Sequence, residues 1–135
     1  NKWPDRVIVF FTTLGTAMPS FILATLLLLV FCVLLAWLPV YSNSNPNLIL
    51  PIISLSVYPM AYVTRLTKTS MLDTLSQDYI RTARAKGVSN GKVIFVHGLK
   101  NGLIPVITYV GPQIAYIITG SMVVENIFNI GGLGS

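Results

Sequence analysis

The absence of charge over residues 7–64 is the strongest constraint on how this chain can fold. No Asp, Glu, Lys or Arg occurs between Arg6 and Arg65, and a second uncharged run covers residues 101–124. A membrane-spanning helix needs about 20 mainly apolar residues, so the first run is long enough for two spans and the second for one. Only 10% of all residues are charged, against about 25% in soluble domains. We therefore expect an all-α membrane protein with three transmembrane helices.

Proline and loop-forming residues divide the chain into predicted segments. Pro19 is expected to kink or divide the first span, because a single helix over that whole stretch would exceed the thickness of the bilayer core. The absence of an initial Met and the end of the sequence just after a span suggest a piece of a longer protein. Within one transmembrane domain, 1–135, the expected order is a span at 7–40, an external loop at 41–47, a span at 48–64, a cytoplasmic loop at 65–103, a span at 104–124 and an external tail at 125–135.

The distribution of positive charge sets the predicted orientation. Most of the nine Lys and Arg residues lie in residues 65–103, and the others lie before residue 7. An excess of Lys and Arg marks the cytoplasmic side of a membrane protein. We therefore expect residues 65–103 to be cytoplasmic, in a multi-pass protein of the cell membrane that contacts the lipid bilayer.

The first half of this loop has the pattern of an amphipathic helix. Residues 70–86 contain neither Gly nor Pro. Apolar side chains recur there at helical spacing, which predicts one apolar stripe. The residues of the predicted stripe are Leu72, Leu75, Tyr79 and Ala83.

A glycine turn and a second helix are expected to follow. Gly87 is a natural residue to end the first helix, since glycine accepts a left-handed backbone conformation without steric penalty. Ser89 is a plausible N-cap for a helix from Asn90 to about Lys100. On physical grounds alone, this pair of helices could be held at the surface by anionic lipid or could be a docking surface for a cytoplasmic partner. Nucleic-acid binding is not expected, because the loop has little aromatic interleaving.

Longer motifs of the chain resemble a known family. The stretch "DYIRTARAKGVSNGKVIFVHGLKNGLIPVIT" at 78–108 resembles the cytoplasmic loop of ABC importer permease subunits of the oligopeptide/dipeptide/nickel family, and most closely the oligopeptide permease. "WLPV" at 37–40 and "GSMVVENIFNIGGLGS" at 120–135 agree with the same family. The resemblance implies a type I importer fold, with three spans here out of roughly six in the subunit.

The resemblance also implies how the subunit works. In such permeases the loop forms coupling helices that insert into a groove on an ATP-hydrolysing subunit. The implied partners are a second homologous permease subunit, two cytoplasmic ATPase subunits, an extracytoplasmic substrate-binding protein and a peptide substrate. ATP is bound by the ATPase subunits, so no cofactor or metal is expected in this chain. The coupling residues carried over are Asp78, Arg81, Ala83, Arg84, Ala85, Lys86, Gly87, Ser89 and His97.

Two positions depart from the family pattern. Arg81 stands where the broader importer loop has a Glu, so that glutamate's contact cannot be carried over. Gly131 replaces the proline of the tail motif N-x-P-G-L-G.

The third predicted span carries polar residues on one helical face. Their spacing places Tyr109, Gln113, Tyr116 and Gly120 together, and polar groups within a span usually face the protein interior or a wet cavity. We expect this face to border the substrate path, although both faces of the helix could equally serve packing alone. No metalloprotease or nucleotide-binding motif is present, and we expect a non-catalytic subunit. The alternatives are an importer of nickel or another small solute, a non-transport membrane scaffold and an intramembrane enzyme.

Overall fold

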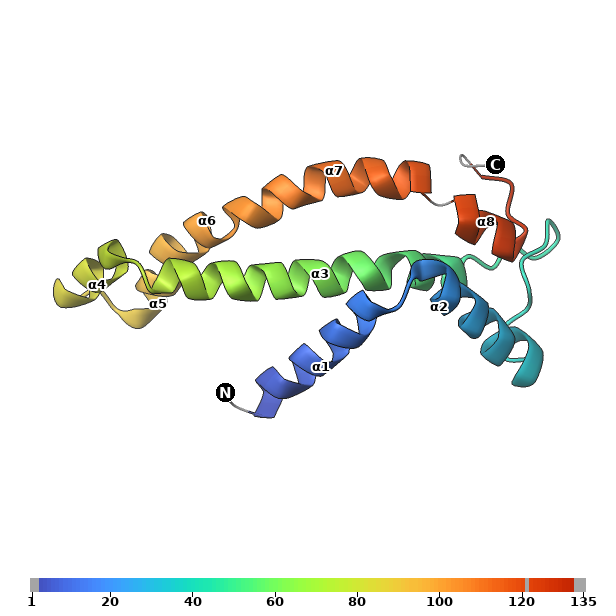
Figure 1. The fold of residues 1–135 in the computed structure, drawn as a ribbon, viewed down its shortest axis with the longest axis horizontal. Helices are drawn as coiled ribbons and strands as arrows, with labels where there is room; N and C mark the ends of the chain where they lie inside the picture. Colours follow the sequence, from blue (N-terminus) through green and yellow to red (C-terminus); the bar gives the residue numbers. More distant parts are fainter. Residues whose placement is uncertain (1–2, 121, 133–135) are drawn as a thin grey trace. The chain divides into compact units, whose positions relative to one another are not determined.

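The structure is a computed structural model that describes residues 3–120 and 122–132. The described chain is helical, with one isolated β-bridge between Ser42 and Asn45, which confirms the expected all-α class. Figure 1 follows the helices along the chain. The chain divides into two compact units: unit 1 comprises residues 1–62 and 113–135, and unit 2 comprises residues 63–112.

Unit 1 begins with two helical limbs that meet at Pro19. Helix α1 runs over Trp3–Ala17, and α2 (Ser20–Leu27) continues into the π-helical segment η1 (Leu28–Leu34). The limbs are bent by 98°, because proline supplies no backbone N–H and clashes with the preceding turn. The prediction that Pro19 divides the first apolar run is confirmed. Each limb has 15 residues, about 22 Å of helix, whereas the bilayer core is about 30 Å thick.

The second limb ends at Leu34, six residues before the predicted end of the first span at residue 40. The chain turns there through Ala36, which has a φ of 50°. The amides of Trp37 and Leu38 both donate to the Phe31 carbonyl, at 3.0 and 3.2 Å. These hydrogen bonds close the limb and lead into the loop at 41–47.

Helix α3 is long and enters both units. It runs over Ile49–Leu75, 27 residues, and thus extends well beyond the predicted end of the second span at residue 64. At 1.5 Å per residue it is about 40 Å long, more than the bilayer core requires. The helix continues because no Gly or Pro interrupts the chain between Pro59 and Leu75.

The described part of the third apolar segment comprises two helices. Helix α7 covers Ile104–Gly120 and α8 covers Met122–Phe128, so Glu125 lies within a helix and not at the start of a glycine-rich tail. Val124 and Phe128 of α8 pack with Ala24 and Leu50 in the core of unit 1. Of the expected tail, residues 133–135 lie outside the described residues.

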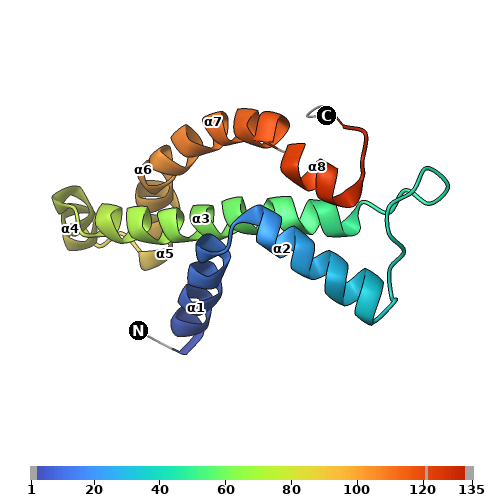
Figure 2. The same cartoon turned by 45° about the vertical axis from the view of Figure 1, so that its right-hand side comes forward.

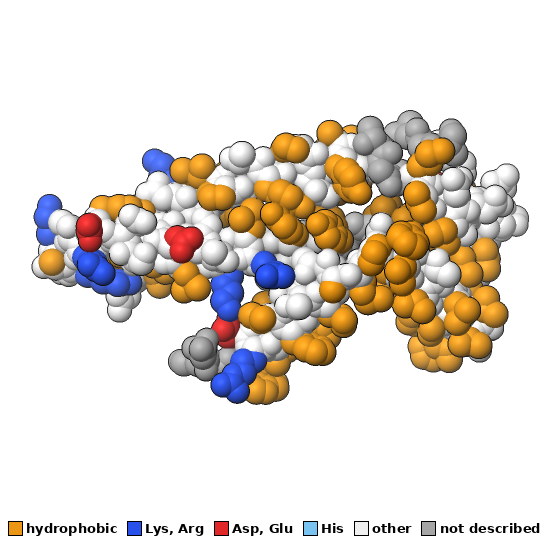
Figure 3. Space-filling model, viewed as in Figure 1, with side chains coloured by type: hydrophobic (Ala, Val, Ile, Leu, Met, Phe, Trp, Pro, Cys, Tyr) orange, Lys and Arg blue, Asp and Glu red, His pale blue; other side chains and the backbone are white. Residues whose placement is uncertain are grey.

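Within the described residues, one helix by itself is long and apolar enough to cross a membrane. That helix is α3, and the number rises to three if each of two bent pairs counts as one span, namely α1 with α2–η1 and Asn90–Gly102 with Ile104–Ile118. The upper number equals the predicted number of spans. Large apolar side chains also lie exposed on unit 1, including Phe10 and Phe11, each 64% exposed. Figure 3 shows such side chains gathered over α2.

Unit 2 contains the charged loop. After α3 it continues through α4 (Asp78–Ala85), α5 (Asn90–Lys92), the π-helical η2 (Val93–Gly98) and α6 (Leu99–Gly102), and then the first part of α7. Ile80 and Val93 are fully buried between these helices. Figure 2 shows α4 and α5 joined by a short turn beyond the end of α3.

Candidate functional site

The turn between α4 and α5 is fixed by its own backbone. Gly87 has a φ of 78°, the left-handed conformation that was expected there. Its amide donates to the Arg84 carbonyl at 3.0 Å, and the Val88 amide donates to the Ala83 carbonyl at 3.2 Å. This pair of hydrogen bonds is the Schellman arrangement of a helix end. The turn is therefore a defined shape and not a loose connection.

Basic side chains surround this turn and lie in solvent. Arg81, Arg84 and Lys86 are all exposed, and Figure 3 shows Lys and Arg side chains gathered over α4. The Arg81 guanidinium lies 3.5 Å from the Asp78 carboxylate, with the two side chains 74% and 95% exposed. An ion pair so exposed contributes little to stability. These charges are available to a partner.

The other predicted coupling residues are distributed around the turn. Ala85 and Ser89 are exposed, whereas Ala83 and His97 are partly buried. Ser89 occupies the N-cap position of α5, as predicted, although its side chain makes no capping hydrogen bond. Its carbonyl instead accepts the Val93 amide at 3.0 Å. The structure thus brings residues 78–89 to one end of unit 2, with His97 further along the following helix.

The prediction of one helix over residues 70–86 is wrong. Helix α3 ends at Leu75, and α4 begins at Asp78 after Gln77 adopts an extended conformation. The Ser76 hydroxyl donates to the Asp73 carbonyl at 2.7 Å. A serine side chain can compete in this way for backbone hydrogen bonds, but Ser54 and Ser56 make the same kind of bond inside α3, so the bond by itself does not account for the helix end.

The helix break changes which face of the loop is buried. Leu72 and Tyr79, two members of the predicted apolar stripe, are 60% and 42% exposed. Ile80 is fully buried instead, together with Val93 from the far side of the turn. The prediction of this stripe was wrong because it assumed that one continuous helix runs through residues 76 and 77.

A second feature missed from the sequence is the close contact of α3 with the run from η2 to α6. Gly98 and Gly102 are both buried, and the Ser70 hydroxyl donates to the Gly102 carbonyl at 2.7 Å. Two glycines four residues apart could have indicated such a contact, since small residues at this spacing let helices approach closely. We name the set Ser70, Met71, Leu75, Gly98 and Gly102 the α3–α6 contact.

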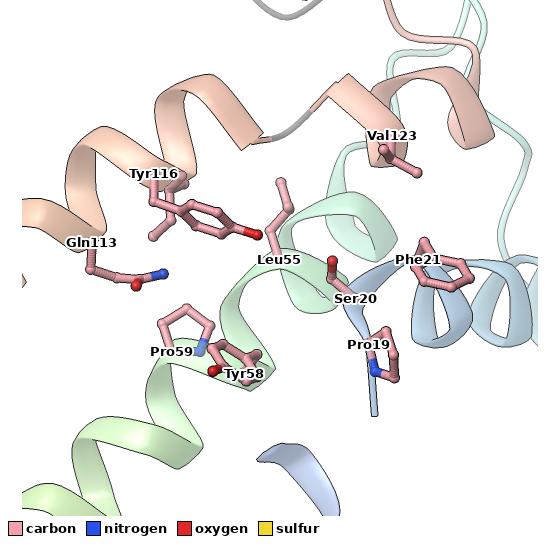
Figure 4. A pocket seen from close by; sticks show the side chains of 10 residues that line it. Pro19, Ser20, Phe21, Leu55, Tyr58, Pro59, Gln113, Tyr116 and Val123 are labelled. Carbon is pink, nitrogen blue, oxygen red and sulfur yellow. The ribbon is translucent and has the colours of Figure 1, made fainter. Parts of the chain in front are cut away.

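Unit 1 contains a cavity of about 340 Å³. It is partly open and lies between α2, α3, α7 and α8, as Figure 4 shows. The Tyr116 hydroxyl and the Gln113 amide point toward the cavity in this view, opposite Tyr58 and Pro59 of α3. The remaining lining residues are Pro19, Ser20, Phe21, Leu55, Ile117 and Val123.

The predicted pathway residues are divided by the structure. Gln113 and Tyr116 line this cavity. Tyr109 lies in unit 2 and is partly buried there. Gly120 is the last residue of α7, and its surroundings lie outside what the structure describes.

A long apolar helix, extensive exposed apolar surface and an exposed basic helical turn are together the features of an integral membrane protein. Comparison with known proteins gives the family. Residues 1–135 match the family described as binding-protein-dependent transport system inner membrane component, and the chain belongs to that family. This confirms the resemblance to ABC importer permeases.

Curated relatives agree with this membership. The chain is 47% identical to the glutathione transport system permease protein GsiC of Escherichia coli K12, over 99% of the chain and 44% of the relative. It is 46% identical to the protein of the same name from Salmonella typhi, with the same coverage. The chain therefore spans less than half the length of these relatives.

Proposed function

We propose that this chain is part of the membrane-spanning permease subunit of an ATP-driven importer, and that it couples to a cytoplasmic ATPase through residues 78–100. The family match over residues 1–135 is the observation that carries the proposal. ATP is bound and hydrolysed by two partner ATPase subunits and not by this chain. A second permease subunit and an extracytoplasmic substrate-binding protein complete the assembly.

The geometry of the α4–α5 turn supports the coupling role. A turn that transmits force has to keep its shape, and the Gly87 and Val88 hydrogen bonds fix this one. Exposed Arg81, Arg84 and Lys86 can donate to carboxylates or carbonyl groups of the ATPase, because charge-assisted hydrogen bonds are among the stronger polar contacts. The excess of Lys and Arg in residues 65–103 supports a cytoplasmic position.

Cysteine labelling in membrane vesicles tests this orientation. In the intact subunit with Cys32→Ala, we expect Asn43→Cys to react with a membrane-impermeant maleimide from outside. Ser89→Cys should react only after the vesicles are opened, and bound ATPase subunits should slow that reaction. Both positions are exposed in the structure. Labelling of Ser89→Cys from outside would overturn the coupling role.

We further propose that the unit 1 cavity belongs to the solute path and that the solute is a peptide. Ser20, Tyr58, Gln113 and Tyr116 place hydroxyl and amide groups in a mainly apolar wall. None of the cavity's described lining residues is an Asp, Glu, Lys, Arg or His, which suits a solute that is held by hydrogen bonds. The relatives' names refer to glutathione, which is a peptide.

Accessibility during transport tests the path. In the same Cys32→Ala background, Gln113→Cys and Tyr116→Cys should react with a water-soluble thiol reagent in at least one transport state, and excess dipeptide or tripeptide should slow the reaction. Ile118→Cys is the matched control, since Ile118 is exposed but does not line the cavity. Failure of both cavity positions to react in every state would remove them from the path.

A further inference from the structure

Two glycines bring the helical run Asn90–Gly102 against the end of α3. A Cβ atom built on Gly98 would lie 3.0 Å from Leu75 Cδ2, and one built on Gly102 would lie 2.5 Å from Met71 Sδ. Figures 1 and 2 both show α6 beside the C-terminal part of α3. The contact is thus close enough that a single methyl group would displace a neighbour.

A buried hydrogen bond fixes the register of this contact. The Ser70 hydroxyl donates to the Gly102 carbonyl at 2.7 Å, and the two residues are separated by 32 positions in the sequence. Ser70 is only 9% exposed. If this hydrogen bond breaks, the buried hydroxyl and carbonyl have no water to bond with instead, and leaving them unsatisfied costs free energy. Sliding of α6 along α3 is therefore opposed by polar as well as steric contacts.

The same helical run is also joined to the α4–α5 turn. The Asn101 side-chain amide donates to the Tyr79 hydroxyl at 3.0 Å. Ile80 of α4 and Val93 of η2 are both fully buried. Contacts thus lead without interruption from the turn, through α6, to α3.

The connection from α6 to α7 is bent, although the Leu103 amide still donates to the Leu99 carbonyl at 3.0 Å and the Ile107 amide donates to the Leu103 carbonyl at 2.9 Å. Leu103 interrupts the helix, and the helical axes on its two sides are bent by 42°. Pro105 follows and has no backbone N–H. It therefore cannot donate the hydrogen bond to the Asn101 carbonyl that any other residue at position 105 of a continuous α-helix would make. Loop or element-terminal residues of this kind absorb the backbone change at a hinge.

We propose that Ser70, Gly98 and Gly102 are positioning residues that fasten the coupling loop to α3, so that α3 moves with the loop while α7 pivots at Leu103. This inference rests on the proposed coupling function. It adds which helix receives the movement and which residues transmit it.

A glycine substitution with a compensating partner tests the contact. Gly102→Ala should lower the number of solute molecules imported per ATP hydrolysed by the intact importer in proteoliposomes. Residues along a coupling route typically change coupling about 2- to 30-fold, and we expect an effect in this range. Met71→Ala should restore coupling in the double variant, because it removes the side chain that the added methyl group would meet. Gly111→Ala is the matched control, since a Cβ at this glycine, which lies outside the coupling residues 78–100, meets nothing within 4 Å.

The hydroxyl gives a second test that leaves the packing intact. Ser70→Ala should reduce the number of solute molecules imported per ATP hydrolysed. Ser70→Thr, which keeps the hydroxyl donor, should reduce this number less. Normal coupling in both Gly102→Ala and Ser70→Ala, or no rescue of Gly102→Ala by Met71→Ala, would overturn the proposal. If these variants couple normally while substitution of the Gly87 turn uncouples transport, only the α3 route is wrong. If turn variants also transport normally, the coupling function itself is wrong.

Distances measured between spin labels would show the movement directly. In the intact importer, labels at Thr69 and Lys100, both exposed, should keep one distance with and without ATP. Labels at Lys100 and Ile114, across the Leu103 break, should change distance between the two states. The opposite result, a constant second distance and a changing first, would assign the movement to α7.

Discussion

The α4–α5 turn and the α3–α6 contact use glycine for different reasons. At the turn, Gly87 has a positive φ, and a Cβ built there would meet nothing within 4 Å. At the contact, a Cβ on Gly98 or Gly102 would meet a side chain of α3 at 3.0 Å or less. The turn needs the conformational freedom of glycine, whereas the contact needs its small size.

Charge separates the same two regions. Arg81, Arg84 and Lys86 are exposed around the turn, and the residues of the α3–α6 contact are all uncharged. The interior of unit 2 is held by apolar packing and by hydrogen bonds of uncharged groups, including the Ser70–Gly102 bond, while Arg81, Arg84 and Lys86 lie outside this interior. Substitutions in the interior should therefore affect stability first, and substitutions at the turn should affect coupling first.

The largest effect is expected from Ile80→Ala. Ile80 is fully buried, and truncation of a buried Ile typically costs about 2–5 kcal/mol. Hydrogen exchange of the amides in residues 78–102 of the intact subunit should become faster. Leu72→Ala is the matched control, because Leu72 belonged to the predicted stripe but is 60% exposed. If both variants accelerated amide hydrogen exchange equally, Ile80 would not belong to the interior of unit 2.

Gly87→Val should have a smaller effect on stability and a large effect on transport. A β-branched residue with positive φ is strained by about 1–3 kcal/mol, so the turn should change shape. ATP hydrolysis should continue with little solute uptake, while membrane insertion stays normal. Gly87→Asn should retain more uptake, since Asn tolerates the left-handed conformation better. Full uptake by Gly87→Val would contradict the coupling role of the turn.

Much of this arrangement could be predicted from the sequence where one residue determines the local backbone. Pro19 predicted the break between α1 and α2, and Gly87 predicted the left-handed turn. The helix break at Ser76 and Gln77 could not be found in the same way, because neither residue forbids a helix. Helical spacing counted across such a break no longer tells which residues share a face. The burial of Ile80 was therefore not predicted.

The α3–α6 contact shows a second limit of reading the sequence. Its hydrogen bond joins Ser70 to Gly102, residues far apart in the chain, and its α3 side includes the polar Ser70. Hydropathy favours placing a serine at the surface, yet its hydroxyl here has a buried partner. The spacing of Gly98 and Gly102 indicated a close helix contact but not which helix would make it.

The smallest effect on stability is expected from Asp78→Asn, which tests the exposed charges near the α4–α5 turn. The Asp78–Arg81 pair is 3.5 Å long, and water screens both partners. Hydrogen exchange in residues 78–102 should remain unchanged within error, in contrast to Ile80→Ala. A clear loss of protection in the loop would mean that charge holds unit 2 together, and the division between a packed interior and a charged docking surface would have to be abandoned.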